Sequence, residues 1–210
     1  MNREEFIAEL EKLGIILTKD QELKLEKFYN LLIEWNQKIN LTRIIEKEDV
    51  YLKHFYDSLT ITKVIDLNKI ESLCDVGTGA GFPGIVLKIV YPKLKITLVD
   101  SLLKRVNYLN TIINELELEN IKAIHTRGED LNEKYDIVTA RAVANIEKLL
   151  IYTMHLVKIN GSLIAMKGNI DEELTNEVLN KINKKYKVTK IEKFLLPKEN
   201  SQRSLVIINH

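Results

Sequence analysis

Two patterns of hydrophobic positions divide this 210-residue chain near residue 66. In the first part, apolar residues recur every three or four positions, which is the spacing of one face of a helix. The two clearest stripes consist of Phe6, Ile7, Leu10 and Leu13, and of Leu25, Phe28, Leu32, Trp35 and Ile39. A third helix is predicted from about Glu48 to Val64. We therefore expect residues 1–66 to form a helical extension, with Trp35 in its core rather than exposed as a platform for bases.

From Lys69 onward, short apolar runs alternate with amphipathic helical stretches. The predicted strands cover residues 70–75, 94–99, 121–125, 135–140, 161–166, 186–195 and 203–209, and the predicted helices cover residues 83–91, 102–117, 144–157 and 171–183. Such alternation is typical of a mostly parallel sheet with helices on both faces. Residues 67–210 are thus expected to form a Rossmann-like α/β domain with a seven-stranded sheet.

A glycine-rich segment follows the first predicted strand. The strand ends at Asp75, a helical pattern begins at Pro83, and between them lie Gly77, Thr78, Gly79, Gly81 and Phe82. Glycine permits positive φ and a close approach of ligand to backbone, and a helix N-terminus presents free N–H groups. We interpret this strand, turn and helix as a cofactor-binding site.

Two carboxylates indicate which cofactor the turn would hold. Asp75 lies two residues before the first glycine, and Asp100, followed by Ser101, ends the second strand. A carboxylate at the position of Asp100 accepts hydrogen bonds from ribose hydroxyls in dinucleotide-binding folds. Asp75 would repel a pyrophosphate but attract the cationic amino and sulfonium groups of S-adenosylmethionine. The pattern favours S-adenosylmethionine, with another nucleotide or a purely structural glycine turn as the alternatives.

Further polar residues are predicted at the same edge of the sheet, where open α/β sheets bind ligands. Gly128 and Glu129 follow the third strand and could receive the adenine through a backbone amide and a carboxylate. Arg141 and Lys167 each end a strand, and Arg203 begins the last one. These three cations either balance charge at strand ends or contact the substrate.

His54 and Asp57 lie three positions apart in the third predicted helix, so that their side chains can share one face. Asp57 could then orient or charge the imidazole, which would make the pair a candidate base or a substrate-positioning group. The alternative is a local pair on the protein surface.

Composition narrows the function classes only in part. The chain has 31 Lys and Arg residues and 30 Asp and Glu residues, and this net charge of +1 does not indicate a nucleic-acid-binding protein. The densest basic cluster comprises Lys181, Lys184, Lys185, Lys187 and Lys190. It is either a solvated surface or part of an RNA-binding face shared with Lys167 and Arg203.

Several features point to a cytoplasmic protein without membrane contact. The first residues are acidic and amphipathic, unlike a signal or transit peptide, and no apolar run approaches the length of a membrane span. The single cysteine, Cys74, excludes an internal disulfide and is expected in the core, where it cannot serve as a nucleophile. No metal site is predicted.

Longer motifs carry a family resemblance that covers nearly the whole chain. These motifs are WNQKINLT, HFYDSL, DVGTGAGFPGIVLKI, LVDSLLKRVNYLN, RAVANIEKLL, LIAMKG and RSLVII. Together they resemble the RsmG family, also called glucose-inhibited division protein B, of bacterial small-subunit ribosomal RNA methyltransferases. HFYDSL, GAGFPG and RAVAN are more specific than the glycine turn, which all class I methyltransferases share.

The resemblance implies a class I enzyme that transfers a methyl group from S-adenosylmethionine to N7 of a guanine in a loop of 16S rRNA. By position, the cofactor contacts of that family fall on Gly77, Phe82, Gly128, Glu129 and Arg141. Gly128 departs from the family, in which alanine is common, so we expect a looser loop at this position. The partner is expected to be 16S rRNA or the small ribosomal subunit, and the oligomeric state is left open.

The chemistry of guanine N7 fits the residues that are present. N7 has a free lone pair and no proton to lose, so methyl transfer to it requires positioning rather than a general base, and its rate should vary little between about pH 6 and 9. The sequence leaves two alternative functions open: a non-catalytic module that binds S-adenosylmethionine and RNA, and a nucleotide-dependent oxidoreductase.

Overall fold

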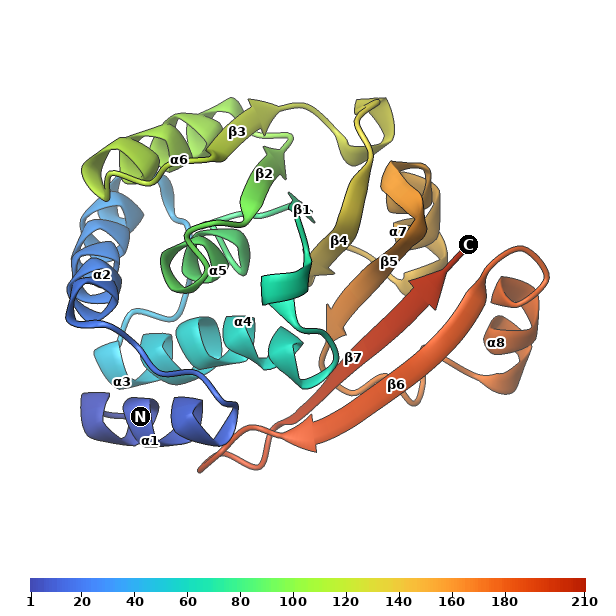
Figure 1. The fold of residues 1–210 in the computed structure, drawn as a ribbon, viewed down its shortest axis with the longest axis horizontal. Helices are drawn as coiled ribbons and strands as arrows, with labels where there is room; N and C mark the ends of the chain where they lie inside the picture. The colour runs from blue at the N-terminus through green and yellow to red at the C-terminus, as the bar shows by residue number, and fades with distance from the viewer.

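A seven-stranded sheet runs through the protein in the computed structural model, which describes residues 1–210 (Figure 1). Its strands are β1 (Ser72–Val76), β2 (Lys95–Asp100), β3 (Ile121–His125), β4 (Tyr135–Arg141), β5 (Val157–Lys167), β6 (Lys187–Leu195) and β7 (Gln202–Asn209). They lie in the order β3-β2-β1-β4-β5-β7-β6. Strands β1 to β5 are parallel, whereas β7 is antiparallel to both β5 and β6. The carboxyl ends of β1 to β5 therefore meet the start of β7 at one edge, which we call the ligand edge.

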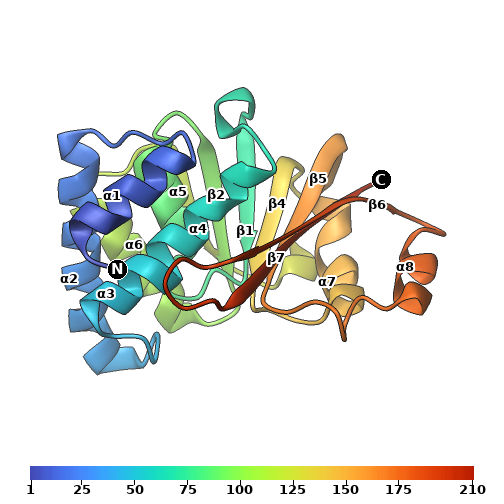
Figure 2. The same ribbon diagram turned by 90° about the horizontal axis from the view of Figure 1, so that it is seen from below.

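Helices cover both faces of the sheet (Figures 1 and 2). They are α1 (Arg3–Lys12), α2 (Lys19–Ile39), α3 (Lys47–Val50), α4 (Asp57–Leu59), α5 (Gly84–Val90), α6 (Leu103–Glu115), α7 (Ile146–Thr153) and α8 (Asn176–Ile182). Helices α1 to α6 bury their apolar sides in one core, and α7 and α8 bury theirs in a second core on the opposite face. No helix combines the length and the apolarity that a membrane span requires.

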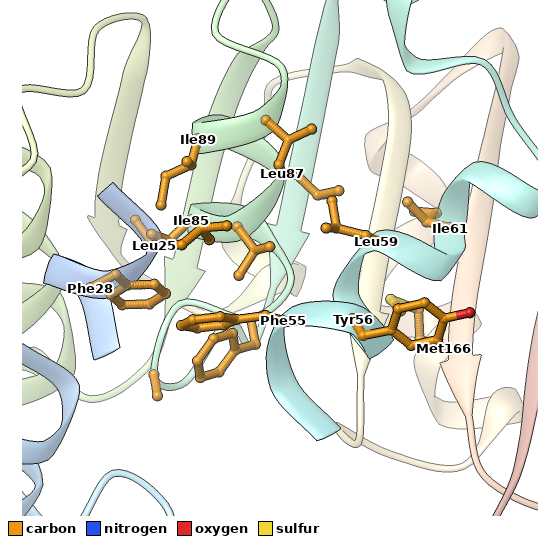
Figure 3. Close-up of a cluster of buried hydrophobic side chains, with 14 of the residues drawn as sticks. Leu25, Phe28, Phe55, Tyr56, Leu59, Ile61, Ile85, Leu87, Ile89 and Met166 are labelled. Carbon is orange, nitrogen blue, oxygen red and sulfur yellow. The ribbon is translucent and has the colours of Figure 1, made fainter. Parts of the chain in front are cut away.

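The larger core joins the N-terminal helices to the sheet. Phe28 of α2 stacks on Phe55, with ring centroids 5.6 Å apart, and approaches Phe82, which follows the glycine turn, at 5.4 Å. Figure 3 shows Leu25 and Phe28 lying close to Ile85 of α5. Because the extension shares a hydrophobic core with the α/β domain, the two pack together as one structural unit. The division of the chain near residue 66 stays a prediction.

Local sequence explains where the first two helices begin. Asn2 and Glu5 form a capping box at the start of α1, and Thr18 and Gln21 form another at the start of α2. Each box pairs free backbone N–H groups of the first turn with side-chain oxygens. Helix α2 ends at Asn40, whose φ of 50° is the left-handed conformation that asparagine tolerates.

The third predicted helix is present as one continuous helical segment from Lys47 to Lys63, made of four short stretches. Between α3 and α4 it contains a π-helical turn, Tyr51–Tyr56, and after α4 it tightens into a 3₁₀ turn, Thr60–Lys63. The sequence pattern did not predict the π turn. Such widened turns are frequent at functional sites.

The predicted strands and the later helices are all present, with two shifted starts. Helix α8 begins at Asn176 rather than near residue 171, because the Thr175 side chain accepts a hydrogen bond from Val178 N and caps the helix there. Strand β5 begins at Val157 rather than at residue 161, because Val157 pairs with Tyr135 across an irregularity in the ladder.

The basic cluster of residues 181–190 lies away from the ligand edge. Lys187 pairs with Asn209 at the end of β7, whereas Lys167 pairs with Ser204 near its start. The antiparallel register thus places the lysines near 184 at the opposite edge of the sheet. The predicted basic face that would join them to Lys167 and Arg203 is wrong.

We expect Gly84→Ala to lower the free energy of unfolding by about 1–3 kcal/mol, because a crowded core cannot accept the extra methyl group. A Cβ on Gly84 would lie 2.2 Å from Leu98 Cδ2 and 2.9 Å from Asp75 Oδ2. Gly168→Ala is the matched control, since its Cβ would meet only Gln202 O at 4.0 Å; it should change stability by less than about 0.5 kcal/mol. Urea unfolding of both variants measures the difference, and equal losses would contradict the packing argument.

Candidate active site

The glycine turn is bound to the end of the neighbouring strand. Gly77 N and Thr78 N both donate to Val99 O of β2, at 2.8 and 3.1 Å. Gly79 N donates to the Asp100 carboxylate at 3.0 Å. The loop between β1 and α5 is therefore held in one conformation by hydrogen bonds to β2.

Asp75 is fully buried beneath this turn. Its Oδ2 accepts hydrogen bonds from Thr78 Oγ1 at 2.6 Å and from Gly84 N at 2.8 Å, while its Oδ1 has no partner. Burial raises the pKa of the carboxyl to about 6, against the lowering effect of these hydrogen bonds. Asp75 thus links the turn to the start of α5, and the predicted attraction of a cationic ligand stays a prediction.

Asp100 has a comparable structural role at the end of β2. Its Oδ1 accepts from Leu102 N at 2.9 Å, and its Oδ2 accepts from Gly79 N and lies 3.4 Å from Arg105 Nη1. The side chain is buried, whereas the adjacent Ser101 is exposed at the ligand edge. The carboxylate orients the backbone of the turn, and its predicted contact with ribose hydroxyls stays a prediction.

Gly79 lies at the open side of the turn. Its φ is +61°, and the nearest atom to an added Cβ would be Gly77 O at 3.9 Å. At Gly77, by contrast, a Cβ would lie 2.6 Å from Cγ2 of Val143, a partly exposed residue of the loop after β4. We call the space over the turn, bounded on one side by Val143, the cradle.

Gly128 and Glu129 lie beyond β3 at the same edge. A Cβ on Gly128 would come within 2.8 Å of Val76 Cγ1 and 3.0 Å of Tyr152 O, so this position is tightly packed. The expectation of a looser loop at Gly128 is therefore wrong, because neighbouring atoms already occupy the room that alanine needs. Glu129 is exposed, with its carboxylate 3.8 Å from Arg127.

A single carboxylate joins two arginines beside the cradle. Asp57 accepts from Arg141 Nη1 at 3.2 Å and from Arg203 Nε at 3.1 Å, so both of its oxygens are paired. Arg141 also donates to Lys53 O at 3.0 Å, and its guanidinium lies over the Phe82 ring at 5.2 Å. We call Asp57, Arg141 and Arg203 the arginine clamp.

His54 is held by other partners than Asp57. Its ring stacks on Phe82 with centroids 4.4 Å apart, its Nε2 lies 3.0 Å from Thr42 Oγ1, and its Nδ1 lies 3.2 Å from Arg141 Nη2. Burial and the neighbouring Arg141 lower the pKa of the imidazole to about 3. The prediction that Asp57 orients or charges His54 is wrong, and so is the alternative of a surface pair, because both side chains are buried.

A cavity of about 330 Å³ opens on the far side of Arg141 from the glycine turn. We call it the edge cavity; its walls include Lys53, Asp57, Arg141, Lys167, Phe194 and Arg203. Lys167 is also paired, with Glu173 at 2.9 Å and with the carbonyl of Ala144. The structure thus brings Arg141 and Lys167 together, as the strand ends predicted, and the antiparallel β7 adds Arg203 to them. Protein groups already pair with all three side chains.

Three residues of this region were not predicted to belong to the site, although Thr42 and Val143 lie within the family motifs WNQKINLT and RAVANIEKLL. Thr42 fixes the imidazole of His54, Val143 packs over the glycine turn, and Phe194 of β6 forms a wall of the edge cavity. Each joins the site through a contact between distant segments, which no local pattern encodes. No group of three or more His, Cys, Asp and Glu side chains is arranged to hold a metal ion.

The glycine turn after β1, the acidic end of β2 and the antiparallel β7 between β5 and β6 together define a class I, Rossmann-like methyltransferase. A solved structure of a SAM-dependent methyltransferase from Aquifex aeolicus has the same fold: its TM-score is 0.59 at 18% identity, with 85% of this chain and 98% of that chain covered.

Sequence comparison gives the family. The chain belongs to the GidB family, described as rRNA small subunit methyltransferase G, whose sequence model matches residues 21–206. The Ribosomal RNA small subunit methyltransferase G of Bacillus licheniformis is 45% identical over 217 residues, covering 99% of this chain and 90% of that protein. The protein of the same name from Bacillus subtilis is also 45% identical, over 215 residues, with the same coverage.

The buried neutral His54 predicts how stability depends on pH. A histidine whose folded pKa lies below its unfolded value of 6.5 stabilises the fold above pH 6.5, and this contribution is lost as the pH falls toward 3. The loss reaches about 1.4 kcal/mol per pH unit. Asp75 has the opposite sign: its raised pKa makes its contribution complete below pH 3.8 and removes it as the pH rises through about 6.

We expect His54→Gln to remove the histidine contribution while leaving that of Asp75 in place. The free energies of unfolding of the variant and of the native protein are measured by urea titration at pH 7 and pH 5. Relative to the native protein, the variant should be more stable at pH 5 than at pH 7. Asp75 is present in both proteins and cancels in the difference. An identical difference at the two pH values would mean that His54 is not held neutral.

Proposed function

We propose that this protein transfers the methyl group of S-adenosylmethionine to small-subunit ribosomal RNA, at N7 of a guanine in a loop of 16S rRNA. The observation that carries the proposal is a contact between the turn and the edge cavity. Arg141 lines the edge cavity, and its guanidinium lies 5.2 Å from the ring of Phe82, which follows the glycine turn. Family membership supports ribosomal RNA as the substrate, and the resemblance described above supports guanine N7.

The residues of the cradle fit S-adenosylmethionine. Gly79 leaves open space where a ligand would lie, and the buried Asp75 Oδ1 lacks a hydrogen-bond partner. The proposed cofactor-binding residues are Asp75, Gly77, Thr78, Gly79, Gly81, Phe82, Asp100, Ser101, Gly128, Glu129 and Arg141. When bound, S-adenosylmethionine supplies a methyl group activated by a positively charged sulfur.

The protein's own groups act by positioning. Both ring nitrogens of His54 are engaged and its pKa is about 3, and both oxygens of Asp57 are paired, so neither residue can act as a base near neutral pH. Guanine N7 needs no base, because it carries no proton. Arg141, Lys167 and Arg203 are proposed to contact guanine O6 or phosphate, because a donor on N7 would occupy the attacking lone pair.

The proposed partner is 16S rRNA, either free or within the small ribosomal subunit, and we place the reaction in the cytoplasm. Guanine N7 is inaccessible in the deep, narrow major groove of A-form RNA, so the target must be unpaired. Methylation assays on naked rRNA, an assembly intermediate and the mature subunit, each from a strain lacking this protein, would identify the form that is used.

We expect Gly79→Val to abolish binding of S-adenosylmethionine, because its side chain would fill the cradle. Gly14→Val is the matched control: Gly14 has a φ of +74° and no atom within 4 Å of an added Cβ. Both variants should lose about 1–3 kcal/mol of stability through backbone strain. Only Gly79→Val should lose affinity in titration calorimetry with S-adenosylhomocysteine, and retained affinity would rule out the cradle as the cofactor site.

The product is expected to be 7-methylguanosine, detected as strand cleavage at one guanine after borohydride and aniline treatment. Single-turnover transfer at saturating cofactor and RNA should be nearly independent of pH between about 7 and 9, because no catalytic base titrates there. The flat range begins above the pKa of Asp75, which is about 6. A rate that rises tenfold per pH unit would refute the base-free mechanism, and ligand binding without any transfer would indicate a non-catalytic module.

A further inference from the structure

The edge cavity lies beside the cradle rather than within it. The glycine turn and Asp100 lie at the ends of β1 and β2, whereas the cavity spans the ends of β4 and β5 and the start of β7. Phe194 of β6 and the His54–Asp57 helical turn complete its lining. Arg141, at the end of β4, lines the cavity and packs on Phe82, the residue that follows Gly81 of the glycine turn. Anything bound in the cavity would therefore be adjacent to a ligand in the cradle.

Positive charge dominates the walls of the cavity. Lys53, Arg141, Lys167 and Arg203 line it, against the single carboxylate of Asp57. Lys53 and Lys167 are neutralised by acidic partners outside the lining, namely Glu199 at 2.6 Å and Glu173 at 2.9 Å. The arginine clamp alone places two guanidinium groups on one carboxylate, which leaves an excess positive charge for an anionic ligand.

The Arg203 side chain is held in place by two hydrogen bonds and keeps a further N–H donor group free. Its Nε donates to Asp57 and its Nη1 donates to Gln202 O at 3.0 Å, while its Nη2 makes no hydrogen bond. The side chain is 23% exposed and lines the edge cavity. A guanidinium fixed in this way is suited to a phosphate oxygen, since little conformational entropy is lost on binding.

Phe194 gives the cavity an aromatic surface. It pairs in register with Arg203 across the antiparallel strands β6 and β7, so the two side chains stand next to each other on the same face. The ring is half-buried, and Lys63 Nζ lies 5.1 Å from its centroid. An aromatic face beside a fixed arginine is the combination on which unstacked RNA bases are held.

We propose that the edge cavity is the acceptor-nucleotide site: it receives one unpaired purine nucleotide of the RNA, with the base stacked on Phe194 and a flanking phosphate bound by Arg203. This proposal rests on the function proposed above and assigns the substrate side of the same site. The cavity volume of about 330 Å³ lies within the range of ligand pockets, about 300–1,000 Å³. Its position across Arg141 presents the base toward the cradle.

The aromatic contact is tested with Phe194→Leu, which keeps an apolar side chain but removes the ring face. In single-turnover methylation, the RNA concentration for half-maximal rate should rise about tenfold, as expected for the loss of one base–aromatic stack. Phe194→Tyr should restore it. Leu195→Ala is the matched control, because Leu195 is the next residue on β6, is 56% exposed and points to the other face.

The phosphate contact is tested with Arg203→Gln in RNA-binding titrations at several salt concentrations. The slope of log affinity against log salt should decrease by about one, the value for one phosphate contact. Lys187→Gln removes the same charge from an exposed position at the opposite edge of the sheet and should leave the slope unchanged. Circular dichroism checks that each variant folds.

Measuring the affinity for the cofactor distinguishes an RNA-binding role of the edge cavity from a cofactor-binding role. Calorimetry with S-adenosylhomocysteine should give the native dissociation constant for both Phe194→Leu and Arg203→Gln. A loss of cofactor affinity in either variant would assign the cavity to the cofactor and overturn the proposal, as would an unchanged RNA requirement in both. If the native protein methylates no guanine of small-subunit rRNA, the proposed function itself fails; if it does, and the variants behave like their controls, only the acceptor site fails.

Discussion

The buried carboxylate of Asp57 is the interaction on which the ligand edge depends. It joins Arg141 at the end of β4 to Arg203 at the start of β7, and it is supplied by the N-terminal helical segment. Burying such charges costs solvation energy, which is offset only when most of their hydrogen-bonding groups are paired. The clamp meets this condition, because both Asp57 oxygens and every guanidinium nitrogen of Arg141 except Nε make hydrogen bonds. The helical extension is therefore part of the site.

Buried carboxylates paired with hydrogen-bond donors also support the cradle. The carboxylate oxygens of Asp75 and Asp100 accept hydrogen bonds from backbone N–H groups of the glycine turn and at the starts of α5 and α6. These bonds hold the turn in a conformation with positive φ at Gly77, Gly79 and Gly81, which glycine adopts without strain. A cofactor that binds a preformed turn loses little energy to ordering the protein.

The geometry around His54 explains why positioning suffices for the proposed reaction. The imidazole is buried between Phe82 and Arg141 and stays neutral, so it contributes shape and hydrogen bonds rather than proton transfer. The order of the strands separates the glycine turn from the edge cavity. The turn lies at β1 and β2, and the cation-lined cavity lies at β4, β5 and β7. Arg141 lines the cavity and packs on Phe82 of the turn, so it links the proposed cofactor space to the proposed acceptor space.

The sequence by itself determined the seven strands, the main helices and the glycine turn, because hydrophobic period, helix caps and glycine spacing are local properties. It also placed Arg141 and Lys167 at one edge, since parallel strands end together, whereas Arg203 reaches this edge because β7 runs antiparallel to β5. Only the tertiary structure decided their partners. Arg141 and Arg203 meet Asp57 across 84 and 146 residues, and the register of β6 on β7 brings Phe194 to the site while it carries the lysines near 184 away. Such contacts follow from strand order and register, which depend on packing of the whole chain.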